Sequence, residues 1–177
     1  MVSRGHLTGM VAGDFGPVEQ KLIHAFKEDG QTSLAKYLAQ PLAPLLLEIS
    51  NGHSGALLVP VPSSRQNYKK RGYRPTVSLG RAVNRLAKQP CLLSNTLYFT
   101  RQVVDQSTLD SSARKANLDS AMYSKPLSSG CPVILFDDVI TTGSTILEAA
   151  RAITVSGGKV IGFLAFAETI LKTGSKI

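Results

Sequence analysis

The chain has 177 residues and a mass of 18.9 kDa, which suits a single domain spanning residues 1–177. A composition of 43% hydrophobic and 18% charged residues excludes disorder as the main state, and a net charge of +8 favours phosphate-bearing partners. Two distant cysteines, Cys91 and Cys131, exclude a disulfide framework and a CxxC zinc module. No apolar run is long enough to cross a membrane, so we expect a cytoplasmic protein with no membrane partner.

The positive charge is concentrated in the middle of the sequence. Residues 65–115 hold eleven bases and two acids, a net charge of +9, whereas the rest of the chain, with nine bases and ten acids, is −1. A solvated basic face would explain this segment, and so would a binding site for a polyanion. The charge alone does not choose between them.

Apolar spacing and turn residues divide the chain into alternating helices and strands. Prolines close the apolar run at 56–62, and a helix-compatible proline begins the segment at residue 75. Thr145 and Glu148 have capping-box spacing. In chain order, the patterns predict helices over 17–29 and 33–49, a strand over 56–62, a helix over 75–89, strands over 96–101 and 132–139, a helix over 145–155 and a strand over 159–168.

This alternation predicts an α/β fold with a central, mostly parallel sheet flanked by helices, because near-continuous apolar strands are typical of sheets covered on both faces. The core would span about residues 55–168. The polar, serine-rich stretch at about 102–130 is long for a connection between strands, which favours a mobile functional loop.

The segment most informative about chemistry is VILFDDVITTGSTILEAA, residues 133–150. Its strand ends in two carboxylates, Asp137 and Asp138, at the sheet edge where α/β proteins bind ligands. The following loop opens a helix, whose free N–H groups and dipole favour phosphate. Gly143 would let the backbone approach the ligand. Together these features predict a site for ribose and its 5-phosphate, with hydroxyl donors from Thr141, Thr142, Ser144 and Thr145.

Other phosphate sites fit this segment less well. A Walker loop needs a Lys after the glycine, and a dinucleotide site needs GxGxxG; the segment has neither. A magnesium-binding acidic pair would leave the hydroxyl-rich loop unexplained. An ordinary strand–turn–helix with a capped terminus is the remaining alternative.

The sequence DDVITTGST, behind four apolar residues, resembles the phosphoribosyl-pyrophosphate (PRPP) motif of type I phosphoribosyltransferases. Three other segments resemble the competence protein F (ComF) branch of that superfamily, and together the likeness covers about residues 15–168. They are FGPVEQKLIHAFKEDG (15–30), VPVPSSRQNYKKRGY (59–73) and RQVVDQSTLDSSARKANL (101–118). The resemblance implies a type I phosphoribosyltransferase-like fold, with the helices at about 17–50 as a hood.

The resemblance also implies roles for particular residues. Asp137 and Asp138 would bind the ribose hydroxyls and act in catalysis, and residues 141–145 would bind the 5-phosphate. The loop after the first core strand, Ser63, Ser64 and Arg65, would bind pyrophosphate. Arg114 and Lys115 on the mobile loop would bring charge to the leaving group, or else form a solvated helix face. Mg²⁺ would arrive with PRPP, with no metal site of the protein's own.

Three departures from the family pattern bear on function. Many members begin with a four-cysteine zinc ribbon that is not seen here, so the chain is either a short form or lacks that segment. Members read RGFNQ where this chain reads RGYRP, residues 71–75. The 6-oxopurine enzymes of the superfamily carry an acid where Thr141 stands, which disfavours hypoxanthine or guanine as acceptor. The nitrogen acceptor is therefore left open.

Two functional hypotheses follow. The first is an enzyme that displaces pyrophosphate from PRPP with an unidentified nitrogen acceptor. The second is a non-catalytic module of the same fold that binds single-stranded DNA or a competence helicase, since the basic residues of 65–74 alternate with Tyr68 and Tyr73. Either could act as a homo-oligomer.

Overall fold

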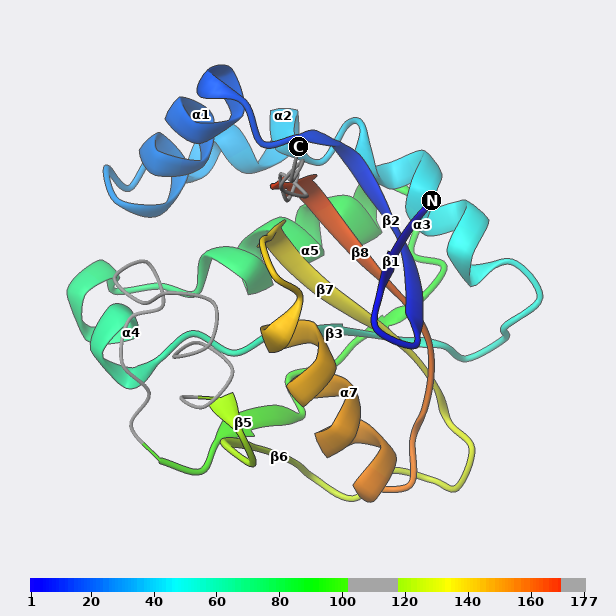
Figure 1. The fold of residues 1–177 in the computed structure, drawn as a ribbon. Coiled ribbons are helices and arrows are strands. Elements are labelled where there is room, and N and C mark those ends of the chain that lie inside the picture. The colour runs from blue at the N-terminus through cyan, green and yellow to red at the C-terminus, as the bar shows by residue number, and fades with distance from the viewer. Residues whose placement is uncertain (102–117, 170–177) are drawn as a thin grey trace, which may run out of the picture.

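The computed structural model describes residues 1–101 and 118–169, which form a central sheet with helices on both faces (Figure 1). The sheet has six strands in the order β1-β2-β8-β7-β3-β4, and all of its neighbouring pairs are parallel except β1–β2. The predicted α/β class with a mostly parallel sheet is therefore confirmed. The strands are β1 (Val2–Arg4), β2 (Leu7–Asp14), β3 (Leu57–Pro60), β4 (Leu92–Leu93), β7 (Pro132–Ile140) and β8 (Lys159–Glu168).

The strands at the centre of the sheet are apolar because both of their faces are covered. Residues 133–136 of β7 and 163–165 of β8 are fully buried. Alternate side chains of β7 enter two different clusters: Ile134 and Phe136 join one, and Val133 and Leu135 join the other. The alternation expected of a strand thus divides the core into two layers.

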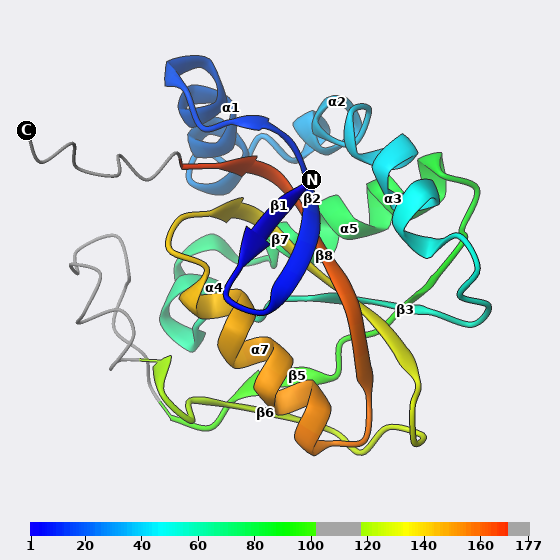
Figure 2. The same cartoon turned by 45° about the vertical axis from the view of Figure 1, so that its right-hand side comes forward.

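The two layers are covered by different helices (Figures 1 and 2). Helices from the first half of the chain pack on one face, and α7 packs on the other. The first strand, β1, is the outermost strand at one side of the sheet, and β2 separates it from β8, the last strand (Figure 2). The helices are α1 (Pro17–Lys27), a 3-10 turn (Thr32–Leu34), α2 (Ala35–Leu38), α3 (Leu42–Ser50), α4 (Arg65–Arg71), α5 (Pro75–Leu86) and α7 (Ser144–Val155).

The helix predicted over 33–49 is wrong as one element. The chain forms a 3-10 turn and two helices, α2 and α3, with Pro41 between them. Proline lacks the N–H that a helix interior needs, and it disfavours helical backbone in the residue before it. The apolar periodicity continued across this break, so the pattern alone did not reveal it.

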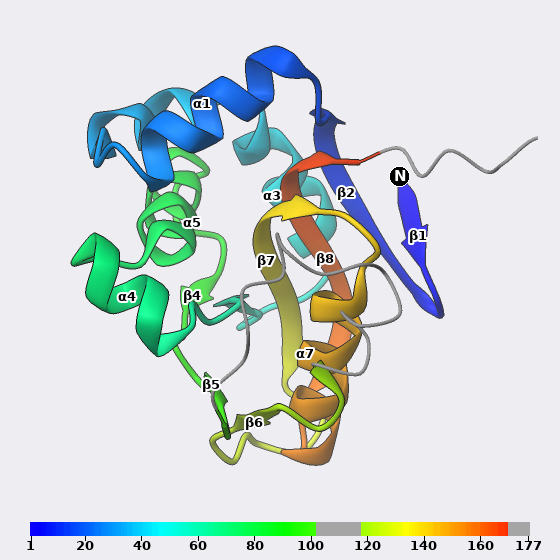
Figure 3. The same ribbon diagram turned by 60° about the vertical axis from the view of Figure 1, so that its left-hand side comes forward.

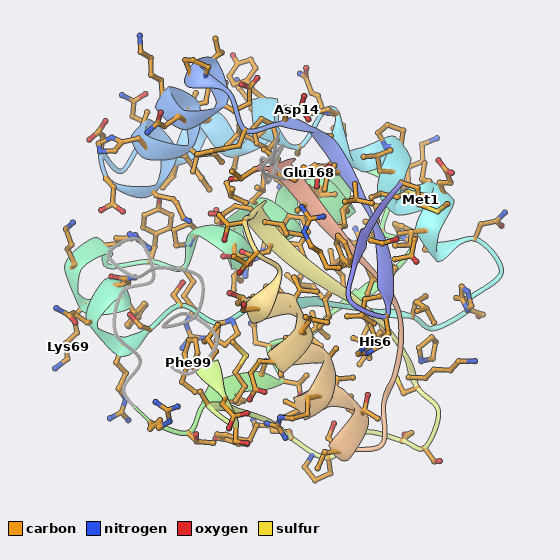
Figure 4. The ribbon with its side chains drawn as sticks, viewed as in Figure 1. Met1, His6, Asp14, Lys69, Phe99 and Glu168 are labelled. Atoms are coloured by element: carbon orange, nitrogen blue, oxygen red, sulfur yellow. The ribbon has the colours of Figure 1, made fainter. Side chains whose placement is uncertain are left out.

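An N-terminal hairpin of β1 and β2 extends the sheet and was not predicted. β2 pairs in parallel with β8, so a segment from the start of the chain lies beside one from its end. Gly9 allows this close approach, because a Cβ there would lie 2.4 Å from the ring and carbonyl oxygen of Phe163. The hairpin places Asp14 beside Glu168 at the carboxyl end of β8 (Figure 4), and the Arg4 guanidinium pairs with Glu168.

Part of the predicted mobile loop is packed structure. Residues 118–130 include β6 (Met122–Ser124), which pairs antiparallel with β5 (Leu97–Phe99) in a second, two-stranded sheet. Leu118, Ala121 and Met122 are buried in the core layer under α7. The loop assignment was wrong for these residues, because a few apolar anchors hold an otherwise polar segment.

The predicted capping box of Thr145 and Glu148 is also wrong. Gly143 is the N-cap of α7, and the Glu148 carboxylate turns instead to β6. It accepts a hydrogen bond from the backbone N–H of Met122 at 2.8 Å and two from Arg151 at 2.7 Å. Arg151 also donates to the carbonyl oxygen of Met122 at 2.7 Å. This pair attaches the second sheet to α7.

We expect Glu148→Ala to lower the free energy of unfolding by about 2 kcal/mol, because it leaves the buried N–H of Met122 without an acceptor. Urea denaturation followed by circular dichroism measures the loss. Glu48→Ala on the exposed surface of α3 is the matched control, with no comparable bond to lose. Equal, small losses in both variants would contradict this role.

Candidate functional site

The two loops predicted to bind phosphates leave the same edge of the sheet. β3 and β7 are parallel neighbours, with Pro60 opposite Phe136. The N–H of Val61 donates to the carbonyl oxygen of Phe136 at 2.8 Å, which keeps the strands together to the end of β3. The loop after β3 and the loop after β7 therefore start side by side, and α1 lies across the carboxyl ends of the strands (Figure 3).

The loop at 141–145 leads directly into α7. Gly143 has φ +82°, a left-handed conformation that glycine adopts without strain, and it is the N-cap of the helix. The hydroxyls of Thr142 and Ser144 lie 2.9 Å apart. Thr142 Oγ1 also accepts from the N–H of Ser144, at 3.4 Å. The sequence correctly placed this hydroxyl-rich loop, including Thr141 and Thr145, at a helix N-terminus.

Arg4 lies against this loop, and sequence reasoning missed it. A Cβ on Gly143 would come within 2.8 Å of the Cβ and Cγ of Arg4, so the arginine stem covers the glycine. The Arg4 guanidinium forms a 2.5 Å ion pair with Glu168 at the end of β8. No local pattern relates residues 4, 143 and 168, since only the unpredicted hairpin brings them together.

The acidic pair at the end of β7 consists of two carboxyls in different environments. Asp137 is half-buried, and its Oδ1 accepts from the N–H of Asp138 at 2.9 Å. Asp138 is 3% exposed, and its Oδ1 accepts from the N–H of Val139 at 2.9 Å. Each carboxylate is thus held to the backbone of the residue that follows it.

Asp138 forms an ion pair that the sequence did not reveal. Its Oδ2 lies 2.5 Å from Nζ of Lys27, in the last turn of α1. Burial acts to raise the pKa of Asp138, but the charge and hydrogen bond of Lys27 outweigh it, so this pKa lies below its ordinary value. Burial and repulsion from Asp138 raise the pKa of Asp137 well above its ordinary value. The pKa values of the two neighbouring carboxyls are therefore shifted in opposite directions.

The loop after β3 turns into α4, a helix absent from the sequence prediction. Ser64 is its N-cap, and the Ser64 hydroxyl accepts from the N–H of Asn67 at 3.2 Å. Ser63 is half-buried beside it, and Arg65 is exposed at the start of the helix. The three residues predicted to bind pyrophosphate therefore lie at the N-terminus of α4. This helix follows β3, the strand next to the one that carries the acidic pair.

A second ion-pair group joins α1 to α4. Glu28, directly after Lys27, pairs with Lys70 at 2.9 Å and makes a short contact with Arg71. These partners lower the pKa of Glu28 to about 2, with the hydrogen bond from Arg71 as the largest cause. Below them, the Tyr73 hydroxyl donates to the carbonyl oxygen of Phe26. Adjacent residues at the end of α1 thus contact both sides of the site.

Two predicted catalytic residues, Arg114 and Lys115, lie outside the described residues. Within residues 1–101 and 118–169, no cluster of three or more His, Cys, Asp or Glu side chains could hold a metal ion. None of the helices in the same ranges is long and apolar enough to cross a membrane.

The described site combines three features: the hydroxyl-rich N-terminus of α7, the acidic pair at the end of β7, and the basic helix α4, which follows the adjacent strand β3. This chemistry suits a ligand that carries both hydroxyls and phosphates. The chain is thus an α/β protein with its candidate site at the carboxyl edge of a mostly parallel sheet, where such folds bind ligands.

Sequence comparison relates the chain to bacterial proteins named for DNA use and competence. DNA utilization protein YhgH of Escherichia coli (strain K12) is 28% identical over 159 residues, which cover 86% of this chain and 68% of that protein. Competence protein F of Haemophilus influenzae is 29% identical, covering 77% and 62%. Competence protein ComFC of Bacillus subtilis is 24% identical, covering 78% and 50%. The predicted resemblance to competence protein F is therefore confirmed by homologues, while no protein-family model matches the chain.

Solved structures similar to this one are phosphoribosyltransferases. A hypoxanthine phosphoribosyltransferase from Staphylococcus aureus aligns with a TM-score of 0.48 at 8% identity, covering 82% of this chain and 71% of that one. An adenine phosphoribosyltransferase from Trypanosoma brucei aligns with a TM-score of 0.44 at 10% identity, covering 98% and 96%.

Proposed function

We propose that this protein binds PRPP and transfers its phosphoribosyl group to a nitrogen acceptor. The observation that carries the proposal is the shared sheet edge: the acidic pair and the loop at 141–145 end one strand, and the loop at 63–65 ends its neighbour. A single PRPP molecule offers ribose hydroxyls, a 5-phosphate and a diphosphate to these three groups.

Each group has a distinct task in this proposal. Asp137 and Asp138 lie at the end of β7, where their carboxyl groups can hydrogen-bond with the ribose hydroxyls. The N-terminus of α7, with the hydroxyls of Thr142 and Ser144, would hold the 5-phosphate. The N-terminal end of α4 with Arg65 would hold the diphosphate. The ring carbon C1 then lies between the two anion sites.

The substrate would be the magnesium complex of PRPP. Asp138 already pairs with Lys27, which leaves the acidic pair poorly suited to bind the metal. The diphosphate oxygens suit Mg²⁺, which keeps several waters and few protein ligands. In the reaction, the bond between C1 and the diphosphate breaks and a bond from the acceptor nitrogen forms. Fixed cations would stabilise the departing diphosphate.

The transferase reaction is tested by incubating the protein with Mg²⁺, PRPP and a panel of nitrogen nucleophiles, including ammonia, amino acids and nucleobases. We expect one class of acceptor to release pyrophosphate at least a hundredfold faster than PRPP hydrolyses alone. The variant Asp137→Asn with Asp138→Asn is the inactive control. Tight binding of PRPP without release by any acceptor would contradict a transferase.

A second function, binding of single-stranded DNA, has its own support on α4. Tyr68 is 45% exposed, with the Arg74 guanidinium 5.3 Å from its ring centre. Lys69 on the same helix extends into solvent (Figure 4). Exposed rings among cations are what single-strand binding uses, and the names of the relatives refer to DNA utilization and competence.

If α4 binds single-stranded DNA, Tyr68→Ala should lower the affinity for an oligonucleotide about tenfold, because stacking of a base on one ring contributes about 1–3 kcal/mol to binding. Fluorescence anisotropy at several salt concentrations measures this, and affinity should fall steeply as salt rises. Tyr37→Ala, which removes an exposed ring from α2, is the control. Equal affinities for both variants would remove α4 from any DNA site.

A further inference from the structure

Arg71 is a nearly buried cation whose hydrogen-bonding capacity is only partly used. Its side chain is 11% exposed, and its contact with Glu28 uses one terminal nitrogen, Nη2. Its Nε is buried with no hydrogen-bond partner in the described part of the chain. A buried, unsatisfied donor on a charged group is costly, and arginine offers a planar set of donors that fits phosphate well. Arg71 can therefore take an additional anionic partner.

Among residues 1–101 and 118–169, two cations of α4 share one carboxylate. Glu28 pairs with both Lys70 and Arg71. The exposed bases Lys69 and Arg74 lie on either side of them in the sequence. A ligand with more than one negative charge would balance this group better than a single carboxylate.

Arg71 also lies within electrostatic range of the acidic pair. Its charge and that of Asp138 both act on the pKa of Lys27, and both act on the pKa of Tyr73. The cation group of α4 and the carboxyls of β7 are thus brought together around the end of α1. A ligand bound by Asp138 would present its charged groups toward Arg71.

We propose that Arg71 and Lys70 form an inner diphosphate-binding site, and that Glu28 is an internal counter-ion which the diphosphate displaces. This rests on the proposed function, because the displacing group is the diphosphate of PRPP. It adds residues beyond the loop at 63–65, and it gives α1 a role in controlling affinity. No covalent bond changes in this step, because one anion replaces another on the same cations.

The displacement need not move α1 as a body. Phe26 is fully buried beside Glu28, with its ring 6.1 Å from that of Tyr73 in an edge-to-face arrangement. These contacts anchor the end of the helix while the Glu28 side chain, 24% exposed, turns to solvent. The released carboxylate regains hydration, which offsets part of the loss of its ion pairs.

The test is a calorimetric titration of magnesium pyrophosphate and of Mg–PRPP into wild type and Glu28→Gln. If Glu28 competes with the ligand, Glu28→Gln should bind both about fivefold more tightly, the effect expected from removing one partly exposed ion-pair competitor. Glu48→Gln, with the same charge change on the exposed surface of α3, should match wild type. Arg71→Met should lower the affinity for magnesium pyrophosphate at least tenfold and leave the affinity for ribose 5-phosphate unchanged.

The outcomes separate this inference from the proposed function. If wild type binds Mg–PRPP but Glu28→Gln binds it equally or less tightly, the counter-ion role is wrong and the proposed function stands. If Arg71→Met keeps full pyrophosphate affinity, the inner site is wrong. If wild type binds neither ligand, the proposed function and this inference fail together. Unfolding midpoints of all variants show that each one is folded.

Discussion

Replacement of Lys27 by methionine is expected to lower the free energy of unfolding by about 3 kcal/mol near neutral pH. Methionine keeps the packing of the stem but removes the only ion-pair partner that the described structure gives to Asp138, which is 3% exposed. A buried carboxylate without a counter-ion is the costly state, more than the loss of the pair itself. Urea denaturation measures the change.

The double variant Lys27→Met with Asp138→Asn supplies the control. It has no buried charge to compensate, so it should recover a large part of the stability lost in the single variant. If the single variant loses less than about 0.5 kcal/mol, the pair behaves like an exposed ion pair and does not hold α1 to β7.

The loss in Lys27→Met should also depend on pH in a defined direction. The pKa of Asp138 is lowered, so its contribution is present above the ordinary value of 3.8 and is lost as the pH falls through the folded value. The pKa of Lys27 is raised, so its contribution is present below 10.5 and is lost as the pH rises through the folded value. The two proteins should therefore differ most between about pH 6 and 9.

Gly143→Ala is expected to lower the affinity for Mg–PRPP at least tenfold and to destabilise the protein. The left-handed backbone at φ +82° costs an alanine about 1–2 kcal/mol. In addition, the new Cβ would lie within 2.8 Å of the Arg4 stem and force that side chain away from the loop. Calorimetry for affinity and urea denaturation for stability measure the two effects.

Gly52→Ala is a matched control for this variant. Gly52 has φ +78°, nearly the same backbone, but no atom lies within 4 Å of a Cβ placed there. It should lose stability from backbone strain alone and bind Mg–PRPP like wild type. Equal losses of affinity in both variants would mean that the loop at 143 is not where the ligand binds.

The elements that the sequence predicted are those specified by local patterns. β7, α7 and the loop between them follow from an apolar run, two acids and a Gly-hydroxyl turn within a short stretch, so the positions of Asp137, Asp138 and Gly143 were predictable. The same reasoning placed the loop at 63–65 after a strand. The central sheet followed from apolar strands alternating with helices.

The missing parts depend on contacts between residues far apart in the sequence. Lys27 reaches Asp138, Arg4 covers Gly143, and Glu28 pairs with Arg71. Lys27, Arg4 and Glu28 each stand in a segment whose local pattern indicates only a solvated face, so the sequence does not reveal their distant partners. Glu148 shows the converse, because its spacing matched a helix cap while its tertiary partners, Met122 and Arg151, determined its position.

We expect the carboxyl end of β7 to bind the ribose and phosphates of PRPP. Calorimetric titration of Mg–PRPP into wild type and into Asp137→Asn with Asp138→Asn tests it most directly. We expect saturable binding to wild type and a loss of at least a hundredfold in the double variant, with magnesium pyrophosphate binding retained by both. Unchanged PRPP affinity in the double variant, or no binding to wild type, would contradict the assignment.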